Sequence, residues 1–140
     1  MKKLFSLNAF FLLIFLVGCS DKAEENHIKQ VNIDEVGEMI DGEKDGFFVP
    51  TISIDREYIT ILKEVFEDYK EENLYIYYTM QPEGESGEVL KRDQYKYVRK
   101  MPKESIYYVK GGEIYKGINL RTYESSDLSS AIEQFIEENR

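Results

Sequence analysis

The chain has 140 residues, with 27 acidic and 18 basic side chains and a net charge of −9 near neutral pH. This acidity argues against binding to nucleic acid and against a body that lies flat on anionic lipid. Because the acidic residues are spread along the chain, they indicate a solvated surface, with an acidic docking face as the alternative. The length accommodates one hydrophobic core, so we expect a single folded domain.

Residues 1–18 have the pattern of an export signal. Two lysines follow the initial methionine, an apolar stretch covers residues 4–17, and the tetrapeptide Leu16-Val17-Gly18-Cys19 closes it. A membrane-spanning helix requires about 20 apolar residues, which is more than this stretch offers. The pattern resembles the signal and lipobox of bacterial lipoproteins. That resemblance implies a diacylglycerol on the Cys19 thiol, cleavage in front of it, and a domain anchored to the cell membrane outside the cytoplasm. An ordinary cleaved signal with a chance cysteine is the alternative.

Polar residues dominate the stretch after the signal. Residues 19–30 show no apolar periodicity and predict a flexible tether, so that the folded domain covers residues 31–140. His27 is the only histidine, and without a second histidine or a further cysteine we expect it to be solvated rather than to bind a metal. Cys19 is the only cysteine, so the domain must fold without a disulfide. The sequence points to no cofactor.

The first half of the domain carries three clear patterns. Asn32 and Glu35 form a capping box and predict a short helix that ends before Asp41. The continuous apolar run over residues 47–52 predicts a strand that is buried on both faces. Apolar residues that repeat at intervals of three and four over residues 55–72 predict the clearest helix, capped by Ser53 or Asp55 near its start.

The second half predicts further strands and helices. They are, in chain order, a strand over 74–80, a loop over 81–87, a short helix over 88–97, two strands over 105–109 and 113–118 that form an antiparallel hairpin, and a last helix capped by Ser125 or Ser126. Tyrosines recur in the strands, and packing in the core is the better interpretation for most of them, with a peptide-binding or sugar-binding surface as the alternative.

This order of elements resembles a thioredoxin fold. Four stretches carry the resemblance: Gly46-Phe-Phe-Val-Pro-Thr51, residues 74–80, Met101-Pro102, and the hairpin over residues 106–118. The resemblance is closest to the small exported thioredoxin-like proteins of Gram-positive bacteria known as bacteriocin transport accessory proteins. It implies an α/β fold with a central mixed sheet of about four strands flanked by helices.

Both redox cysteines of that family are absent. Where the family has Thr-Cys-x-x-Cys, this chain has Thr51-Ile-Ser-Ile-Asp55. Disulfide exchange requires a thiolate and a second thiol, so activity of the thioredoxin type is excluded. Pro102 matches the family's cis-proline beside the site, and the resemblance favours a cis peptide bond. Because Lys103-Glu104 places the proline about one residue further from the strand than usual, a trans loop proline is the alternative.

The sequence therefore predicts a membrane-anchored, non-catalytic domain that binds a protein or peptide as an accessory factor. The binding residues that the resemblance suggests are Thr51, Ile52, Ser53, Asp55 and Pro102. If the resemblance extends to biology, the partner is an exported bacteriocin or its transporter. The alternatives are a structural or immunity-type lipoprotein, and a hydrolase without thiols that uses Asp55 and a tyrosine.

Overall fold

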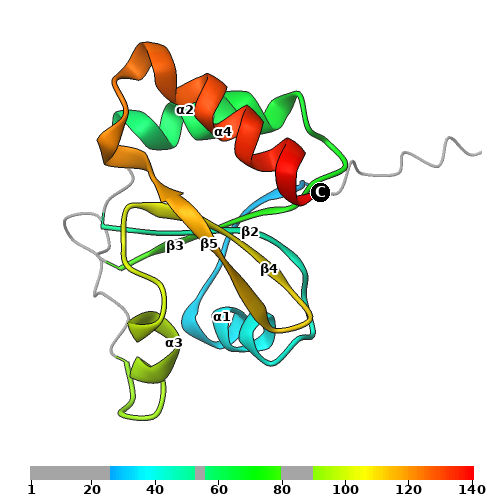
Figure 1. Ribbon diagram of the computed structural model, residues 1–140. Helices are drawn as coiled ribbons and strands as arrows, with labels where there is room; N and C mark the ends of the chain where they lie inside the picture. Colours follow the sequence, from blue (N-terminus) through cyan, green and yellow to red (C-terminus); the bar gives the residue numbers. More distant parts are fainter. Residues whose placement is uncertain (1–25, 53–55, 80–89) are drawn as a thin grey trace, which may run out of the picture.

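A computed structural model describes residues 26–52, 56–79 and 90–140 of the chain (Figure 1). Cys19, Ser53, Asp55 and the loop predicted over residues 81–87 lie outside these ranges. The elements are, in chain order, β1 (Ile28–Gln30), α1 (Ile33–Ile40), β2 (Gly46–Thr51), α2 (Glu57–Glu67), β3 (Leu74–Tyr78), α3 (Tyr95–Arg99), β4 (Ser105–Lys110), β5 (Glu113–Asn119), the 3-10 helix η1 (Leu120–Thr122) and α4 (Ser125–Asn139).

The described strands form one mixed sheet, in the order β1-β3-β2-β4-β5. β1, β3 and β2 run parallel, whereas β4 is antiparallel to both β2 and β5. Helices α2 and α4 cover one face of the sheet, and α1 and α3 lie on the other (Figure 1). The α/β class, the mixed sheet and the flanking helices are confirmed, but the sheet has five strands instead of about four.

The additional strand, β1, lies inside the segment predicted to be a flexible tether, so that prediction is wrong for Ile28–Gln30. β1 pairs with β3, and the Leu74 N–H donates to the His27 carbonyl at 2.8 Å. His27 is half-buried, and its Nε2 lies 2.8 Å from the carbonyl oxygen of Phe66, so it is not the solvated side chain we expected. A strand of three residues is too short for apolar alternation to reveal it, because its pairing depends on the backbone.

Alternate residues of the central strands face opposite layers. Phe47 and Val49 of β2 pack in the core beneath α2 and α4, whereas Phe48 packs in the second core beneath α1. All of β2 and β3 is buried, which confirms the prediction that β2 is buried on both faces. The tyrosines of the strands follow the core interpretation, since four of them are buried: Tyr75, Tyr77, Tyr78 and Tyr107.

The helix starts agree with the sequence in one case out of four. The capping box of α1 is present, because Asn32 N donates to Glu35 at 2.9 Å and Glu35 N donates to Asn32 at 3.0 Å. No serine caps α4: Glu124 is its N-cap residue, and the Ser125 hydroxyl donates to Glu57 of α2 instead. Helix α2 begins only after Arg56, which makes no side-chain cap, and α3 begins later than predicted. Within the described ranges, no helix is both long enough and apolar enough to cross a membrane.

The β4–β5 hairpin contains a close backbone approach at Gly117. A Cβ atom there would overlap the carbonyl oxygen of Ile106, at the point where the register between the two strands shifts. We expect Gly117→Ala to lower the free energy of unfolding by about 1–3 kcal/mol, because the hairpin must deform to admit the methyl group. Gly111→Ala is the control for backbone strain alone, since Gly111 has a φ of 57° but no atom near its Cβ position. A Gly117→Ala protein with the same urea midpoint as the wild type would contradict the steric argument.

Candidate binding site

The candidate site lies where β2 ends in the middle of the sheet. Pairing of β2 with β4 extends only from Gly46 to Phe48, which leaves room for Pro50, a residue without a backbone N–H. Past the last ladder pair, the Pro50 carbonyl accepts a hydrogen bond from Glu104 N at 2.8 Å. The Thr51 carbonyl accepts another from Thr79 N at 2.8 Å. The end of β2 is therefore fixed from both sides.

Glu104 is the residue that joins the surrounding segments. Its carboxylate accepts hydrogen bonds from the Thr51 hydroxyl at 3.3 Å and from the Ile52 N–H at 3.2 Å. Its own carbonyl accepts a bond from Leu120 N at 2.8 Å. The side chain is buried with 6% exposure, and the backbone has a φ of 65°, in the left-handed region that non-glycine residues rarely adopt. Strained backbone of this kind persists only where its surroundings hold it, and it is frequent at functional sites.

Tyr58, from the first turn of α2, completes a buried cluster of three side chains with Thr51 and Glu104. The two hydroxyls of Tyr58 and Thr51 lie 2.8 Å apart. Because the Thr51 hydroxyl donates to Glu104, the Tyr58 hydroxyl is the donor to Thr51. All three residues are buried, so this Thr51–Tyr58–Glu104 cluster has little surface with which to touch a ligand. Through Glu104, the cluster holds the backbone N–H of Ile52, which precedes α2 in the chain.

The sequence-predicted site residues differ in their exposure. Thr51 is buried inside the cluster, Ile52 is half-buried at its rim, and Pro102 is exposed. Ser53 and Asp55 lie outside the described residues, so the use of Asp55 as a cap or as a catalytic group remains a prediction. Of the five, the structure brings Thr51 and Ile52 together through Glu104.

The preference for a cis bond before Pro102 is wrong. No peptide bond among the described residues is cis, so Met101 and Pro102 are joined in trans. The extra length of Lys103-Glu104 explains the difference. The chain turns at Glu104 through its positive φ, and it is the Glu104 N–H, rather than the proline, that meets the end of β2. The Pro102 carbonyl is held separately, by the Tyr107 hydroxyl at 2.8 Å.

Sequence reasoning missed Glu104 and Tyr58 as residues of this site. Tyr58 belongs to the apolar stripe of α2, so it could not be told from an ordinary core residue. Glu104 stands in a charged stretch between a proline and a strand, where an exposed side chain is the default. The one available signal was the spacing itself, because the additional residue before β4 has to be accommodated by a turn.

The hydrogen bond from Tyr107 to Pro102 leads to a prediction at alkaline pH. Burial raises the pKa of the Tyr107 hydroxyl, although the Ser105 side chain opposes part of this effect. The folded state thus favours the neutral phenol, so its stabilising contribution is complete below about pH 10 and is lost as the pH rises through the raised folded pKa. We expect the urea midpoint of the wild type to fall above about pH 10 more steeply than that of Tyr107→Phe. Parallel profiles for the two proteins would contradict this assignment.

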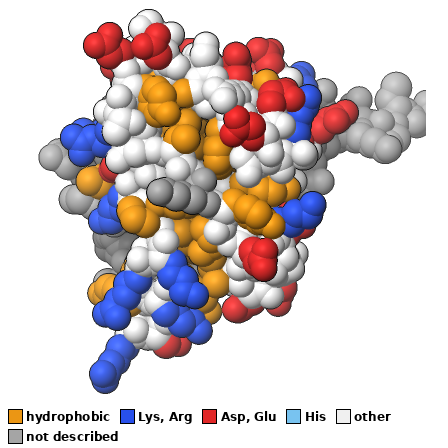
Figure 2. Space-filling model, viewed as in Figure 1, with side chains coloured by type: hydrophobic (Ala, Val, Ile, Leu, Met, Phe, Trp, Pro, Cys, Tyr) orange, Lys and Arg blue, Asp and Glu red, His pale blue; other side chains and the backbone are white. Residues whose placement is uncertain are grey.

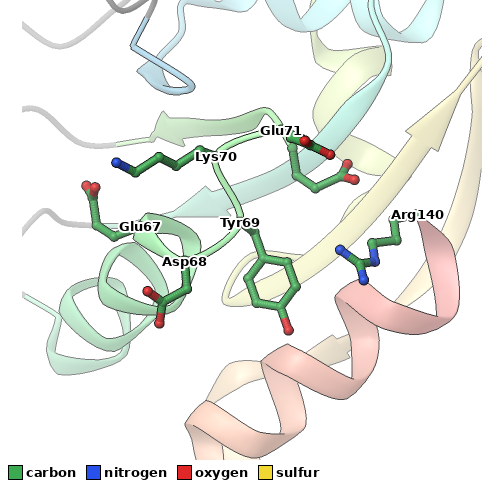
Figure 3. A pocket seen from close by; sticks show the side chains of 7 residues that line it. Glu67, Asp68, Tyr69, Lys70, Glu71 and Arg140 are labelled. Carbon is green, nitrogen blue, oxygen red and sulfur yellow. The ribbon is translucent and has the colours of Figure 1, made fainter.

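A hollow lies at the end of the sheet opposite the candidate site, where α2 ends (Figure 3). It has a volume of about 400 Å³ and is lined by Glu67, Asp68, Tyr69, Lys70, Glu71, Glu72 and Arg140. The Arg140 guanidinium lies 5.5 Å from the centre of the Tyr69 ring. The lining is charged and largely exposed, and within the described residues no group of three histidine, cysteine, aspartate or glutamate side chains could hold a metal ion. This hollow contains no sequence-predicted site residue.

Comparisons of this chain with known protein families, with curated proteins and with solved structures find no match. The site is therefore interpreted from its own geometry.

Proposed function

We propose that the chain is a lipoprotein anchored outside the cytoplasm, whose thioredoxin-like domain binds an extended protein or peptide segment without catalysing a reaction. The binding surface is the end of the sheet that carries Ile52 and Pro102. The buried Thr51–Tyr58–Glu104 cluster supports this surface, because it holds the Ile52 backbone in place. The observation that carries the proposal is the buried residue Glu104 at the end of β2. Its carboxylate accepts hydrogen bonds from Thr51 and Ile52, and its backbone N–H donates to the Pro50 carbonyl. Tyr58 joins the start of α2 to the same cluster through Thr51.

The strand arrangement supports the thioredoxin-like part of the proposal. The sheet order β1-β3-β2-β4-β5, with three parallel strands and an antiparallel hairpin at one edge, fits the order of elements that the sequence resemblance implies. In that arrangement the end of β2 and the segment before β4 meet at one place. Glu104 of this chain occupies that meeting point, where it bonds to the Pro50 carbonyl.

The chemistry of the site supports binding in preference to catalysis. The only cysteine of the chain is Cys19, so no thiol stands at the end of β2. Glu104, Thr51 and Tyr58 are all buried and bonded to one another, which leaves them without access to a substrate. Such a network fixes a backbone in one conformation, and a preorganised backbone loses less entropy when it binds an extended partner.

Photo-crosslinking in native membranes tests the proposed surface. An apolar diazirine amino acid replaces Ile52, and the same probe at Glu133, exposed on α4, is the control. We expect a discrete protein or peptide adduct from position 52 alone. The first clients to look for are exported bacteriocins and their transporters, as the family resemblance suggests. Equal adducts from both positions, or none from position 52, would remove the basis for a binding surface there.

Mass spectrometry of the mature amino terminus tests the anchor separately. The lipobox predicts that the mature chain starts at Cys19 and carries a diacylglycerol on its thiol. A mature chain that starts elsewhere, or with an unmodified cysteine, would contradict the lipid anchor.

A further inference from the structure

The basic residues of this acidic protein are concentrated beside the candidate site. Residues 91–103 contain six lysines and arginines and a single acidic residue, a net charge of +5, so that the rest of the chain carries −14. The six are Lys91, Arg92, Lys96, Arg99, Lys100 and Lys103, and we call them the basic face; all are exposed. Figure 2 shows lysine and arginine side chains gathered over the end of the molecule that carries α3 in Figure 1.

These charges are not used to hold the fold together. Within the described part of the chain, no carboxylate forms an ion pair with any residue of the basic face. Among the acidic residues of α1, Glu35 and Glu38 pair with Lys44, and Asp34 accepts a hydrogen bond from the uncharged Gln94. Tyr95, 47% exposed, is the most exposed large hydrophobic residue described, and Lys96 lies 4.7 Å from the centre of the Tyr97 ring. Exposed tyrosine and arginine are enriched at surfaces that contact a partner.

The basic face is rigidly attached to the fold next to the candidate site. Gln94 donates a hydrogen bond to Asp34 of α1 at 2.9 Å, and the Tyr97 ring covers Gly37 of the same helix. The segment then continues through Pro102 to Glu104, which bonds to the end of β2. A partner that lies on Ile52 and Pro102 would therefore also meet the basic face.

The position at which the chain enters the domain argues against the membrane, and for a peptide, as the partner of the basic face. His27 precedes β1 and contacts Phe66 near the end of α2, at the end of the parallel strands opposite the candidate site. A tether to the membrane thus leaves the domain at the far end from the basic face. The remaining charge of −14 also disfavours an approach of the whole body to anionic lipid.

We propose that the basic face selects an acidic partner segment: the ligand of the candidate site is an extended peptide rich in aspartate or glutamate. This inference rests on the proposed function and names the chemistry of its ligand. Cations around a binding surface attract such a segment before contact and exclude basic segments, and both effects weaken as salt screens the charges.

Peptide binding to the full chain, purified in a neutral detergent, tests the inference. The probes are three peptides of equal length that alternate threonine with glutamate, glutamine or lysine. We expect the glutamate peptide to bind about tenfold more tightly than the glutamine peptide and to lose this advantage at high salt, whereas the lysine peptide should not bind. The double variant Lys96→Glu with Lys100→Glu should remove the preference. The double variant Lys70→Glu with Lys110→Glu, which makes the same change of charge at exposed lysines elsewhere, should retain it.

The outcomes separate this inference from the proposed function. Equal binding of the glutamate and glutamine peptides would overturn the acidic preference and leave the peptide site intact. Flotation with anionic but not neutral vesicles, lost in the Lys96 and Lys100 variant and without peptide binding, would assign the basic face to the membrane instead. Concentration-dependent self-association lost in the same variant would assign it to the acidic surface of a second copy. The absence of binding by all three peptides would overturn both proposals.

Discussion

Glu104→Ala is expected to lower the free energy of unfolding by about 2–4 kcal/mol, because it removes the acceptor for one buried and one partly buried donor. The Thr51 hydroxyl and the Ile52 N–H both donate to this carboxylate, and the site is closed to solvent by burial. Urea unfolding followed by circular dichroism measures the change. The variant should also bind the glutamate peptide less tightly than the wild type, since the Ile52 backbone is no longer held.

Two further substitutions separate the lost hydrogen bonds from the unusual backbone at the same position. Glu104→Gly removes the same carboxylate but relieves the strain of a φ of 65°, so it should be about 1 kcal/mol more stable than Glu104→Ala. Glu104→Gln keeps a side-chain acceptor and should fall between the wild type and the alanine variant. Glu133→Ala, at an exposed position of α4, should change stability by no more than about 0.5 kcal/mol. If Glu104→Ala is as stable as Glu133→Ala, the clamp does not contribute to the fold.

Phe47→Ala is expected to have the largest effect in the protein, a loss of about 3–5 kcal/mol of unfolding free energy. Phe47 is fully buried in β2, and its ring lies 5.4 Å from Phe66 of α2, 5.0 Å from Tyr108 of β4 and 5.9 Å from Phe135 of α4. Its removal leaves a cavity between the sheet and both helices of that layer. Because small domains are stable by only about 5–15 kcal/mol, a large fraction of the protein should be unfolded at elevated temperature.

Thermal and urea unfolding of a matched series checks this expectation. Phe47→Leu retains most of the buried volume and should be much less destabilised than Phe47→Ala. Tyr123→Ala removes a larger side chain from a position that is 38% exposed, and it should have a small effect. A Phe47→Ala protein that is no less stable than Tyr123→Ala would mean that the two helices do not pack on β2 as described.

The parts of the fold that sequence predicts well are those in which apolar residues dominate. Strands β2 and β3 are continuous apolar runs, and α2 and α4 have clear stripes, so burial alone defines them. Their ends are less predictable. Helix α2 begins two residues later than expected and ends five residues earlier, because apolar periodicity continues into Tyr69 beyond the last helical residue.

The parts that sequence does not predict depend on pairing between distant backbone groups. β1 contains two charged or polar residues out of three, and only its alignment with β3 makes it a strand. The conformation at Pro102 and the burial of Glu104 follow from the way one additional residue is accommodated between two elements. The six lysines and arginines of the basic face are close together in the sequence. The net charge of the whole chain conceals them, because it is dominated by the acidic residues elsewhere.

The short strand β1 also limits how far the domain can travel if Cys19 carries the proposed lipid. A tether that ended at residue 30 would have a reach of about 38 Å when fully extended, whereas one that ends at His27 has a reach of about 28 Å. β1 therefore shortens the reach of the tether by about 10 Å, and loss of the pairing between β1 and β3 would restore the longer reach. Because the candidate site lies at the far end of the domain, partners are restricted to those whose distance from the bilayer does not exceed this reach plus the length of the domain.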